Sequence, residues 1–175
     1  MSSKVLVIAA SESVLEIMGE AKKVLDEFGV ENEITISSAH RSPERTKEIV
    51  VDAQAKGIKV IICGAGLAAH LAGVVAAHFS LPVIGVPLKH GGTEGLEGLD
   101  ALLATLQMPP GIPVATVAIN GAKNAGILAV QILATADKGL EQKLVDYKNK
   151  LSVGVEEKAT RLEDLGIEGY LSGKK

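Results

Sequence analysis

The chain has 175 residues, of which 47% are hydrophobic and 22% are charged, so it is long enough for one well-packed domain and too apolar for a disordered protein. Its net charge is −3 and only 2% of its residues are aromatic, which disfavours nucleic-acid binding, because phosphate contacts need a basic excess and base stacking needs aromatic rings. The single cysteine, Cys63, excludes an internal disulfide, and no apolar run reaches the roughly 20 residues that cross a bilayer. We therefore expect a cytoplasmic protein that binds neither nucleic acid nor membranes.

Short runs rich in β-branched residues recur at regular intervals along the chain and predict strands. The first and third runs are continuously apolar rather than alternating, as in parallel strands that are covered on both faces. Five strands are predicted: Lys4–Ile8, Glu33–Ser37, Lys59–Cys63, Pro82–Val86 and Val114–Ile119.

Helical patterns fill the intervals between these runs. The first has apolar residues at spacings of three and four and ends at Gly29, and Ser42–Lys56 ends in the same way at Gly57. Further helices are expected after Gly66, around Leu99–Leu106 and at Ala122–Ala136. The alternation predicts an α/β fold, a three-layer α/β/α sandwich on a parallel sheet of about five strands in the order 2-1-3-4-5. The first of these helical patterns, which ends at Gly29, consists of Leu15, Met18, Ala21, Lys22, Leu25 and Phe28.

The C-terminal part differs from the rest, because charge density rises from Asp137 to Leu165 and the pattern becomes that of an amphipathic helix. We expect a single catalytic domain over residues 1–175, with a core at about 4–136 and a helical extension at about 137–166. The mean hydropathy is +0.28, and so apolar a chain is expected to have more apolar surface than a domain of this size buries, which predicts a homo-oligomer.

Chemistry-bearing side chains gather where the second predicted strand ends, in the segment Ser38-Ala39-His40-Arg41. Ligands of open α/β sheets bind at the carboxyl ends of strands. Histidine exchanges protons near neutral pH, and arginine binds phosphate with a planar fork of donors. The segment therefore favours acid–base chemistry on a phosphorylated small molecule; the alternative is a plain helix start with Ser42 as N-cap and Pro43 at the first helical position.

The loops after the first and third strands carry weaker signals. Ser11 and Ser13 offer hydroxyls to an anion, or else cap a helix. Gly64 and Gly66 allow a ligand to approach the backbone closely, or else only form a tight turn. His70 follows this loop and can face either the site or a neighbouring element.

Other reactive residues do not form a recognisable site. His78 lies among alanines and is interpreted as structural, and His90 beside Lys89 is interpreted as solvated. The histidines show no metal-ligand spacing, so no metal is expected. Cys63 falls inside a predicted strand and no nucleophile elbow is present, which leaves cofactor-free proton chemistry at His40.

Several motifs in order resemble the PurE family, the N5-carboxyaminoimidazole ribonucleotide mutases of purine biosynthesis. They are Ser-Ala-His-Arg-Ser-Pro at 38–43, Gly-Ala-Gly-Leu-Ala-Ala-His-Leu at 64–71 and Gln-Met-Pro-Pro-Gly-Ile-Pro-Val at 107–114. The late helix, with Asn124-Ala125 and residues 128–133, also matches, and the resemblance runs from about Lys4 to Tyr147.

This resemblance implies a flavodoxin-like subunit, a homo-octamer with sites where subunits meet, and a cofactor-free shift of a carboxylate from the exocyclic nitrogen to carbon 4 of an aminoimidazole ribonucleotide. Carbon dioxide would be released and held in the pocket, with His40 as the proton shuttle. Ser11, Ser38 and Arg41 would hold the 5′-phosphate, and the 64–70 loop would enclose the imidazole and the carbon dioxide. The implied substrate-binding residues are Ser11, Ser13, Ser38, Ala39, Arg41, Gly64, Ala65, Gly66, Leu67 and His70.

The chain departs from the family pattern at three places. Val14 stands where the family has an aspartate that binds the ribose hydroxyls, and the loss of such a contact costs on the order of 1–3 kcal/mol if the partner stays buried and unpaired. Glu12 or Glu16 are candidates to replace that aspartate. The 88–98 loop is longer and more charged than is usual in the family, and Ala72 replaces a proline.

Four functions remain open at this point. The mutase is favoured because the segments around His40 and His70 resemble the mutase branch of the family. The alternatives are a carboxylase that uses carbon dioxide directly, a divergent member acting on another phosphorylated substrate, and a non-catalytic nucleotide-binding protein.

Overall fold

The computed structural model describes residues 4–89 and 96–173 and contains one five-stranded parallel sheet. Its strand order, β2-β1-β3-β4-β5, is the predicted one. All neighbouring strands pair in parallel, so their carboxyl ends lie at the same edge of the sheet. The strands are β1 (Val5–Ala9), β2 (Asn32–Ile36), β3 (Val60–Gly66), β4 (Val83–Leu88) and β5 (Ala115–Thr116).

The strand boundaries differ from prediction mainly at β3 and β5. β3 continues past Cys63 to Gly66, which carries the ladder into the glycine-containing loop. β5 is much shorter than the predicted Val114–Ile119, because beyond Thr116 the regular pairing with β4 gives way to single bonds such as Val117 N–H to the Gly85 carbonyl.

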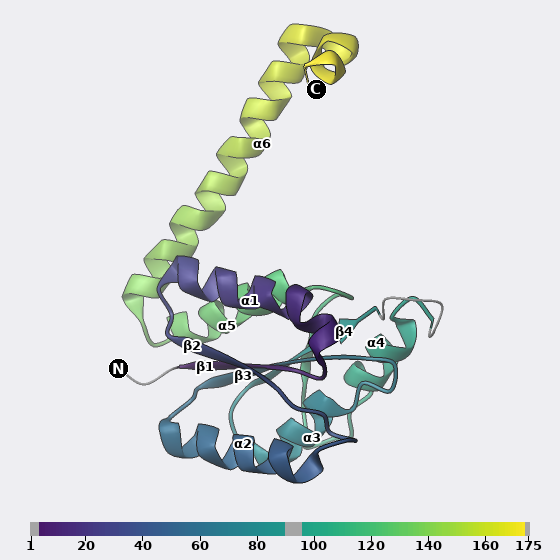
Figure 1. The fold of residues 1–175 in the computed structure, drawn as a ribbon. Coiled ribbons are helices and arrows are strands. Elements are labelled where there is room, and N and C mark those ends of the chain that lie inside the picture. The colour runs from purple at the N-terminus through teal and green to yellow at the C-terminus, as the bar shows by residue number, and fades with distance from the viewer. Residues whose placement is uncertain (1–3, 90–95, 174–175) are drawn as a thin grey trace. The chain divides into compact units, whose positions relative to one another are not determined.

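Helices cover both faces of the sheet, as Figure 1 shows, which confirms the predicted three-layer sandwich. α1 (Leu15–Phe28) and α5 (Ala122–Ala134) lie on one face, and α2 (Pro43–Lys56) and α3 (Leu71–His78) lie on the other. A one-turn 3₁₀ helix, η1 (Glu12–Val14), precedes α1, and α4 (Leu99–Leu106) packs on β4.

Helix ends follow the predicted glycines. Gly29 and Gly57 end α1 and α2 in the left-handed region, with φ of 72° and 78°, where glycine has no Cβ to clash. The predicted apolar face of α1 is buried at Met18, Ala21, Leu25 and Phe28, while Leu15 and Lys22 are only half-buried and Val24, which was not predicted, is buried.

α1 and α5 pack closely because α5 carries a glycine at their contact. A Cβ at Gly126 would lie 2.9 Å from the Ala21 carbonyl oxygen and 3.1 Å from Val24 Cβ. The sequence pattern predicted a helix here but not this near-contact of backbones, because the partner helix lies about a hundred residues earlier in the chain.

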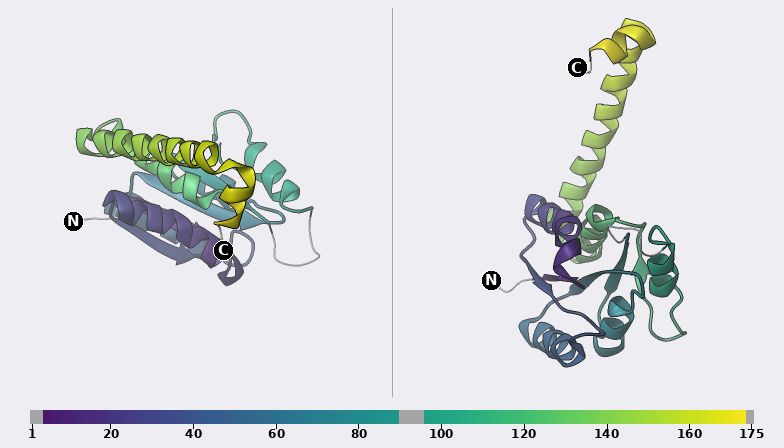
Figure 2. Two further views of the ribbon diagram at one scale, coloured as in Figure 1. Left: turned by 90° about the horizontal axis from the view of Figure 1, so that it is seen from above. Right: turned by 45° about the vertical axis from the view of Figure 1, so that its right-hand side comes forward.

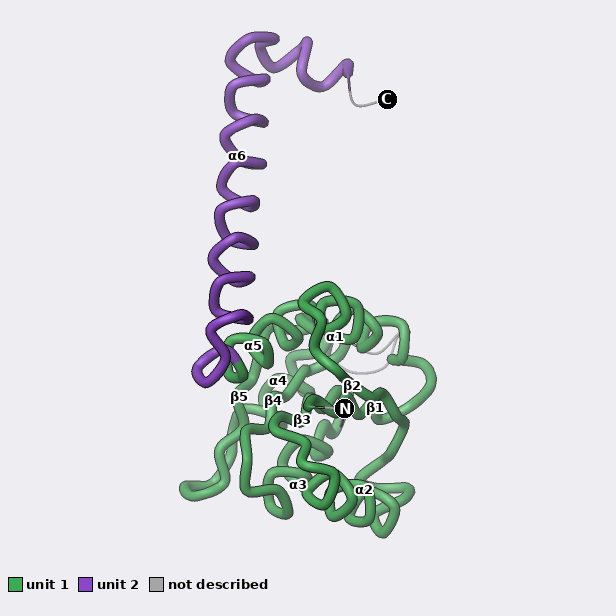
Figure 3. The backbone as a smooth tube through the Cα atoms, turned by 90° about the vertical axis from the view of Figure 1, so that its left-hand side faces the viewer, with its two compact units in different colours: residues 1–133 green, residues 134–175 purple. Residues whose placement is uncertain are grey.

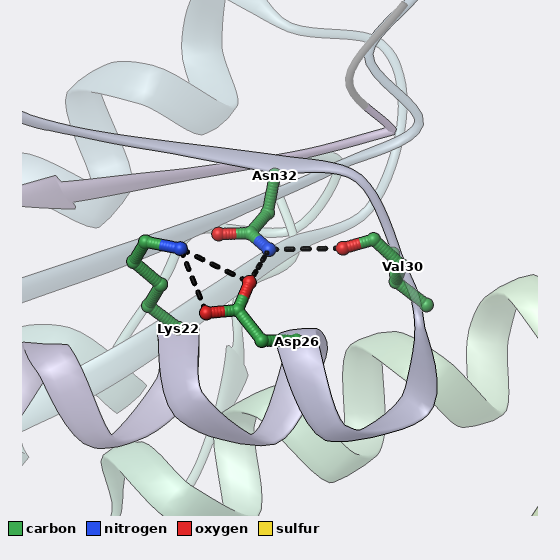
Figure 4. Close-up of polar contacts among 4 residues, drawn as sticks. All are labelled: Lys22, Asp26, Val30 and Asn32. Atoms are coloured by element: carbon green, nitrogen blue, oxygen red, sulfur yellow. Dashed lines mark hydrogen bonds and ion pairs between the residues drawn. The ribbon is translucent and has the colours of Figure 1, made fainter. Parts of the chain in front are cut away.

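A polar network joins the end of α1 to the start of β2 (Figure 4). Asn32 Nδ2 donates to Asp26 Oδ1 at 2.8 Å and to the Val30 carbonyl at 2.9 Å. Lys22 Nζ donates to both Asp26 oxygens, at 3.0 and 2.8 Å. The Lys22 ammonium, and then the Asn32 amide, hold the pKa of Asp26 below its ordinary value.

The chain divides into two compact units, residues 1–133 and 134–175 (Figure 3). The second unit is dominated by α6 (Lys138–Ser172), which begins with Asp137 accepting hydrogen bonds from Gly139 N and Leu140 N and continues beyond the predicted end near Leu165. Its last turns bend at Gly166, where φ is 62° and ψ is 171° (Figure 2). Within the described part of the chain, no helix combines the length and apolar character that a membrane crossing requires.

Candidate functional site

A cavity of about 310 Å³ lies where the first three strands end. Its walls come from the β1–α1 loop (Ala10, Ser11 and Val14), the β2–α2 loop (residues 38–41) and the β3–α3 segment (residues 65–68, 70 and 71). This is the sheet edge at which the sequence placed the chemistry, because parallel strands bring their carboxyl ends together.

Two histidines meet in this cavity. His40 Nε2 lies 2.8 Å from His70 Nδ1, and the two rings are nearly perpendicular, at 85°. A hydrogen bond between two imidazoles needs one nitrogen to donate and the other to accept, so one N–H group lies between the two rings. The sequence predicted both residues at this edge but not their contact.

The β2–α2 loop that carries His40 is fixed by a set of hydroxyl and backbone bonds. Ser42 Oγ accepts from Ser38 N at 3.1 Å and donates to the Ser38 carbonyl at 3.2 Å. Ser42 occupies the N-cap position of α2, but its side chain makes no capping bond to that helix. It instead closes the loop on which His40 and Arg41 stand.

A buried hydroxyl pair anchors the same loop to α2. Thr46 Oγ1 donates to the Ser42 carbonyl at 3.2 Å and lies 2.8 Å from Ser37 Oγ. Because Thr46 has a single hydroxyl proton and gives it to Ser42, Ser37 is the donor in the Ser37–Thr46 bond. Both residues are almost completely buried, at 2% and 0% exposure, so the loop starts from a rigid base.

The polar groups of the cavity wall suit an anion. Ser38 Oγ accepts a bond from Arg41 N–H at 3.2 Å, which leaves its own hydroxyl proton to donate. Arg41 is exposed, and among the described residues no ion pair or hydrogen bond engages its guanidinium. The lining residues that the structure describes include this arginine and two histidines but no carboxylate. The local charge therefore favours a phosphate or carboxylate ligand.

The remaining wall is apolar. It is formed by alanines together with Val14, Leu67 and Leu71. Val14 is 4% exposed and belongs to η1, so its side chain forms part of the packed wall and offers no hydrogen bond. The cavity thus has a polar part near Arg41 and an apolar part around the β3–α3 loop.

The cavity contains most of the residues predicted for the site, namely Ser11, Ser38, Ala39, His40, Arg41, Ala65, Gly66, Leu67 and His70. Two predicted residues lie away from it. Ser13 is exposed and does not line the cavity, and its hydroxyl lies 2.7 Å from that of Ser11. Gly64 is buried within β3, where a Cβ would lie 2.1 Å from Met18 Sδ, so its lack of a side chain makes room for Met18 of α1. The predicted approach of a ligand to the Gly64 backbone stays a prediction.

Three lining residues were not named individually as site residues. Ala68 belongs to the 64–70 loop that the resemblance implied for the imidazole and the carbon dioxide, whereas Ala10 and Leu71 adjoin predicted loop residues and had only this adjacency as a sequence signal. The lining residues also include Val14, which stands where the resemblance to the family would place an aspartate.

The remaining reactive residues lie elsewhere. Cys63 is buried in β3, as predicted, and burial raises the pKa of its thiol far above the ordinary value. His78 is exposed at the end of α3, and His90, with most of the 88–98 loop, lies outside the described residues. Within residues 4–89 and 96–173, no group of three or more His, Cys, Asp or Glu side chains is arranged to hold a metal ion.

Comparisons with known proteins identify the family and the fold. The family model described as AIR carboxylase matches residues 4–153. The chain is 54% identical over 166 residues to an N5-carboxyaminoimidazole ribonucleotide mutase of Pyrococcus horikoshii, covering 95% of this chain and 92% of that protein. It is 52% identical over 171 residues to the protein of the same name from Thermotoga maritima, covering 98% of each. The crystal structure of Treponema denticola PurE superposes with a TM-score of 0.81 at 27% identity, covering 90% of this chain and 97% of that one.

Proposed function

The chain belongs to the AIR carboxylase family, and from this membership we propose that it is an N5-carboxyaminoimidazole ribonucleotide mutase of purine biosynthesis. The observation that carries the proposal is the His40–His70 pair, at 2.8 Å, in a cavity that also contains the Arg41 guanidinium. This arrangement offers one proton-exchanging group and one anion-binding group to the same small molecule.

The proposed reaction exchanges one proton and needs no outside reactant. The bond between the exocyclic nitrogen and the carboxylate carbon breaks, its electron pair goes to the nitrogen, and His40 supplies a proton there. The released carbon dioxide stays in the cavity. Carbon 4 of the ring then attacks it, and the proton displaced from carbon 4 returns to His40, so the histidine ends as it began.

The His40–His70 contact assigns roles to the two nitrogens of His40. His70 Nδ1 is hydrogen-bonded to Nε2 of His40, so Nδ1 of His40 is the nitrogen left to exchange a proton with the substrate. When His70 accepts the bond, the proton on His40 Nε2 stays in place, and only Nδ1 gains and loses a proton during the reaction. His70 therefore acts as a positioning residue that selects the working tautomer.

The phosphate of the substrate would bind in the polar part of the cavity. Arg41 supplies the forked donor of its guanidinium. Ser38 Oγ accepts a hydrogen bond from the Arg41 backbone N–H, so its own hydroxyl proton is available for the phosphate. Ser11 adds a second hydroxyl, which Ser13 orients from 2.7 Å. The imidazole and the carbon dioxide would then lie in the apolar part, beside Ala39, Ala65, Gly66 and Leu67.

We further propose that residues 1–175 act as one catalytic domain, with a core at 4–136 and an extension at 137–166. The protein works as a homo-octamer in the cytoplasm. It uses no cofactor or metal and binds neither nucleic acid nor membranes. The octamer is implied by the family resemblance. Exposed leucines support self-association: Leu99, Leu103 and Leu106 of α4 are 48%, 47% and 42% exposed, and Leu151 and Leu162 of α6 are 54% and 43% exposed.

The test is turnover of the purified protein with N5-carboxyaminoimidazole ribonucleotide, following the appearance of the carbon-4 carboxylate. We expect conversion by the unchanged protein, loss of at least about a hundredfold in kcat for His40→Asn, and no loss for His78→Asn, a histidine exposed at the end of α3. Normal turnover by His40→Asn would contradict the proposed mechanism.

The same assay separates the mutase from the direct carboxylase. A mutase converts the N5-carboxylated substrate without added bicarbonate. A carboxylase makes the same product only from aminoimidazole ribonucleotide and dissolved carbon dioxide. No reaction with either substrate would favour the divergent family member, for which the buried Val14 in the cavity wall is the structural reason.

A further inference from the structure

One residue of the cavity wall has a backbone conformation that its side chain disfavours. Leu67 has a φ of 52°, in the left-handed region that leucine rarely adopts. The described part of the chain contains two other such non-glycine residues, Glu97 and Asn120, and neither belongs to the cavity wall. Strain of this kind persists where the surroundings fix it, and it is concentrated at functional sites.

The surroundings of Leu67 fix the loop from both ends. On one side, Gly66 is the last residue of β3 and pairs with Leu88 of β4. On the other side, His70 N donates to the Ala68 carbonyl at 2.9 Å and His70 is held by His40. The backbone at position 67 therefore has little freedom to relax, although a glycine there would adopt the same conformation without strain.

The Leu67 side chain lines the part of the cavity in which the imidazole and the carbon dioxide would lie. Leu67 is half-buried and belongs to the apolar part of the cavity wall, between Gly66 and Ala68 and close in sequence to His70. Among the β3–α3 loop residues that line this wall before His70, it is the largest, because the others, Ala65, Gly66 and Ala68, carry at most a methyl group.

We propose that the Leu67 side chain is the barrier that keeps the detached carbon dioxide inside the cavity, an inference that rests on the proposed mutase function. After the nitrogen–carbon bond breaks and His40 protonates the nitrogen, carbon dioxide is a free, uncharged molecule. It either reacts with carbon 4 or leaves, in which case the products are aminoimidazole ribonucleotide and, after hydration, bicarbonate and a proton. An apolar side chain over this space slows both the exit of carbon dioxide and the entry of water.

The experiment follows the fate of the carboxylate. Substrate carrying a ¹³C-labelled N5-carboxylate is converted in unlabelled buffer, and the label is measured in the carbon-4 carboxylate and in dissolved bicarbonate, together with the amount of aminoimidazole ribonucleotide released. Leu67→Ala removes the side chain and keeps the unfavourable φ, whereas Leu67→Gly removes both. Leu81→Ala is the matched control, because Leu81 is 44% exposed and lies outside this cavity.

We expect the unchanged protein and Leu81→Ala to retain the label, and Leu67→Ala and Leu67→Gly each to lose on the order of fivefold more of it to the buffer. Because glycine relieves the backbone strain, Leu67→Gly also gives a stably folded variant if Leu67→Ala does not fold. Retention equal to that of the unchanged protein in either folded variant would overturn the role of the Leu67 side chain. Absence of turnover by the unchanged protein, or loss of label from it, would instead overturn the mutase function itself.

Discussion

Replacing Gly64 by alanine tests the packing that positions the catalytic loops. An added Cβ at Gly64 would lie 2.1 Å from Met18 Sδ, 2.8 Å from its Cε and 2.9 Å from its Cγ, and Met18 is completely buried. The strand cannot move away freely, because Ala9 pairs with Gly64 and Ala10 N donates to the Gly64 carbonyl at 2.9 Å. Overpacking of this kind costs about 1–3 kcal/mol of the free energy of unfolding.

Urea denaturation at one fixed protein concentration measures this cost. With a denaturant slope of about 2 kcal/mol per molar, the Gly64→Ala midpoint falls by about 0.5–1.5 M. Gly19→Ala is the control on the neighbouring helix, since a Cβ there meets no atom within 4 Å and alanine favours a helix by up to about 1 kcal/mol.

A double variant identifies Met18 as the cause. Met18→Ala alone leaves a cavity that costs about 2–5 kcal/mol. In Gly64→Ala with Met18→Ala, the new methyl group enters that cavity, so the combined loss falls short of the sum of the single losses by roughly 1–3 kcal/mol. Losses that add within about 0.5 kcal/mol, or an unchanged midpoint for Gly64→Ala, would refute the reasoning.

Three further predictions concern single groups. His70→Leu lowers kcat by about ten- to a hundredfold because His40 Nε2 loses its hydrogen-bond partner. His70→Asn keeps an acceptor near the position of Nδ1, so its kcat falls less. Equal losses of kcat for the two variants in steady-state assays would count against tautomer selection. Cys63 does not react with iodoacetamide at pH 8 unless denaturant is present, since its thiol is buried and its pKa is raised; rapid labelling of the native protein, read by mass spectrometry, would contradict this. Asp26 has a lowered pKa in the folded protein, so the stability it adds is present above its unfolded pKa and is lost as pH falls through the folded pKa. Melting curves of the unchanged protein and Asp26→Asn should therefore converge below about pH 4, and a constant difference across pH would exclude a role for the charge that Lys22 stabilises.

Much of the fold followed from local patterns. The continuous apolar runs of β1 and β3 and the helix-ending Gly29 and Gly57 led to the three-layer sandwich and its strand order. The same patterns placed Ser38 to Arg41 at the carboxyl end of a strand, where ligands bind. These inferences succeed because hydrophobic periodicity and turn chemistry act over a few residues and are visible in the sequence itself.

The tertiary structure alone decided how the loops meet. The bond between His40 and His70 joins residues 30 positions apart, and its geometry depends on how the β2–α2 and β3–α3 loops are anchored. The role of Gly64 likewise depends on Met18, which lies on a helix earlier in the chain. The positive φ of Leu67 follows from constraints at both ends of its loop, against the preference of leucine itself. Such contacts depend on packing between distant segments, which composition and spacing do not encode locally.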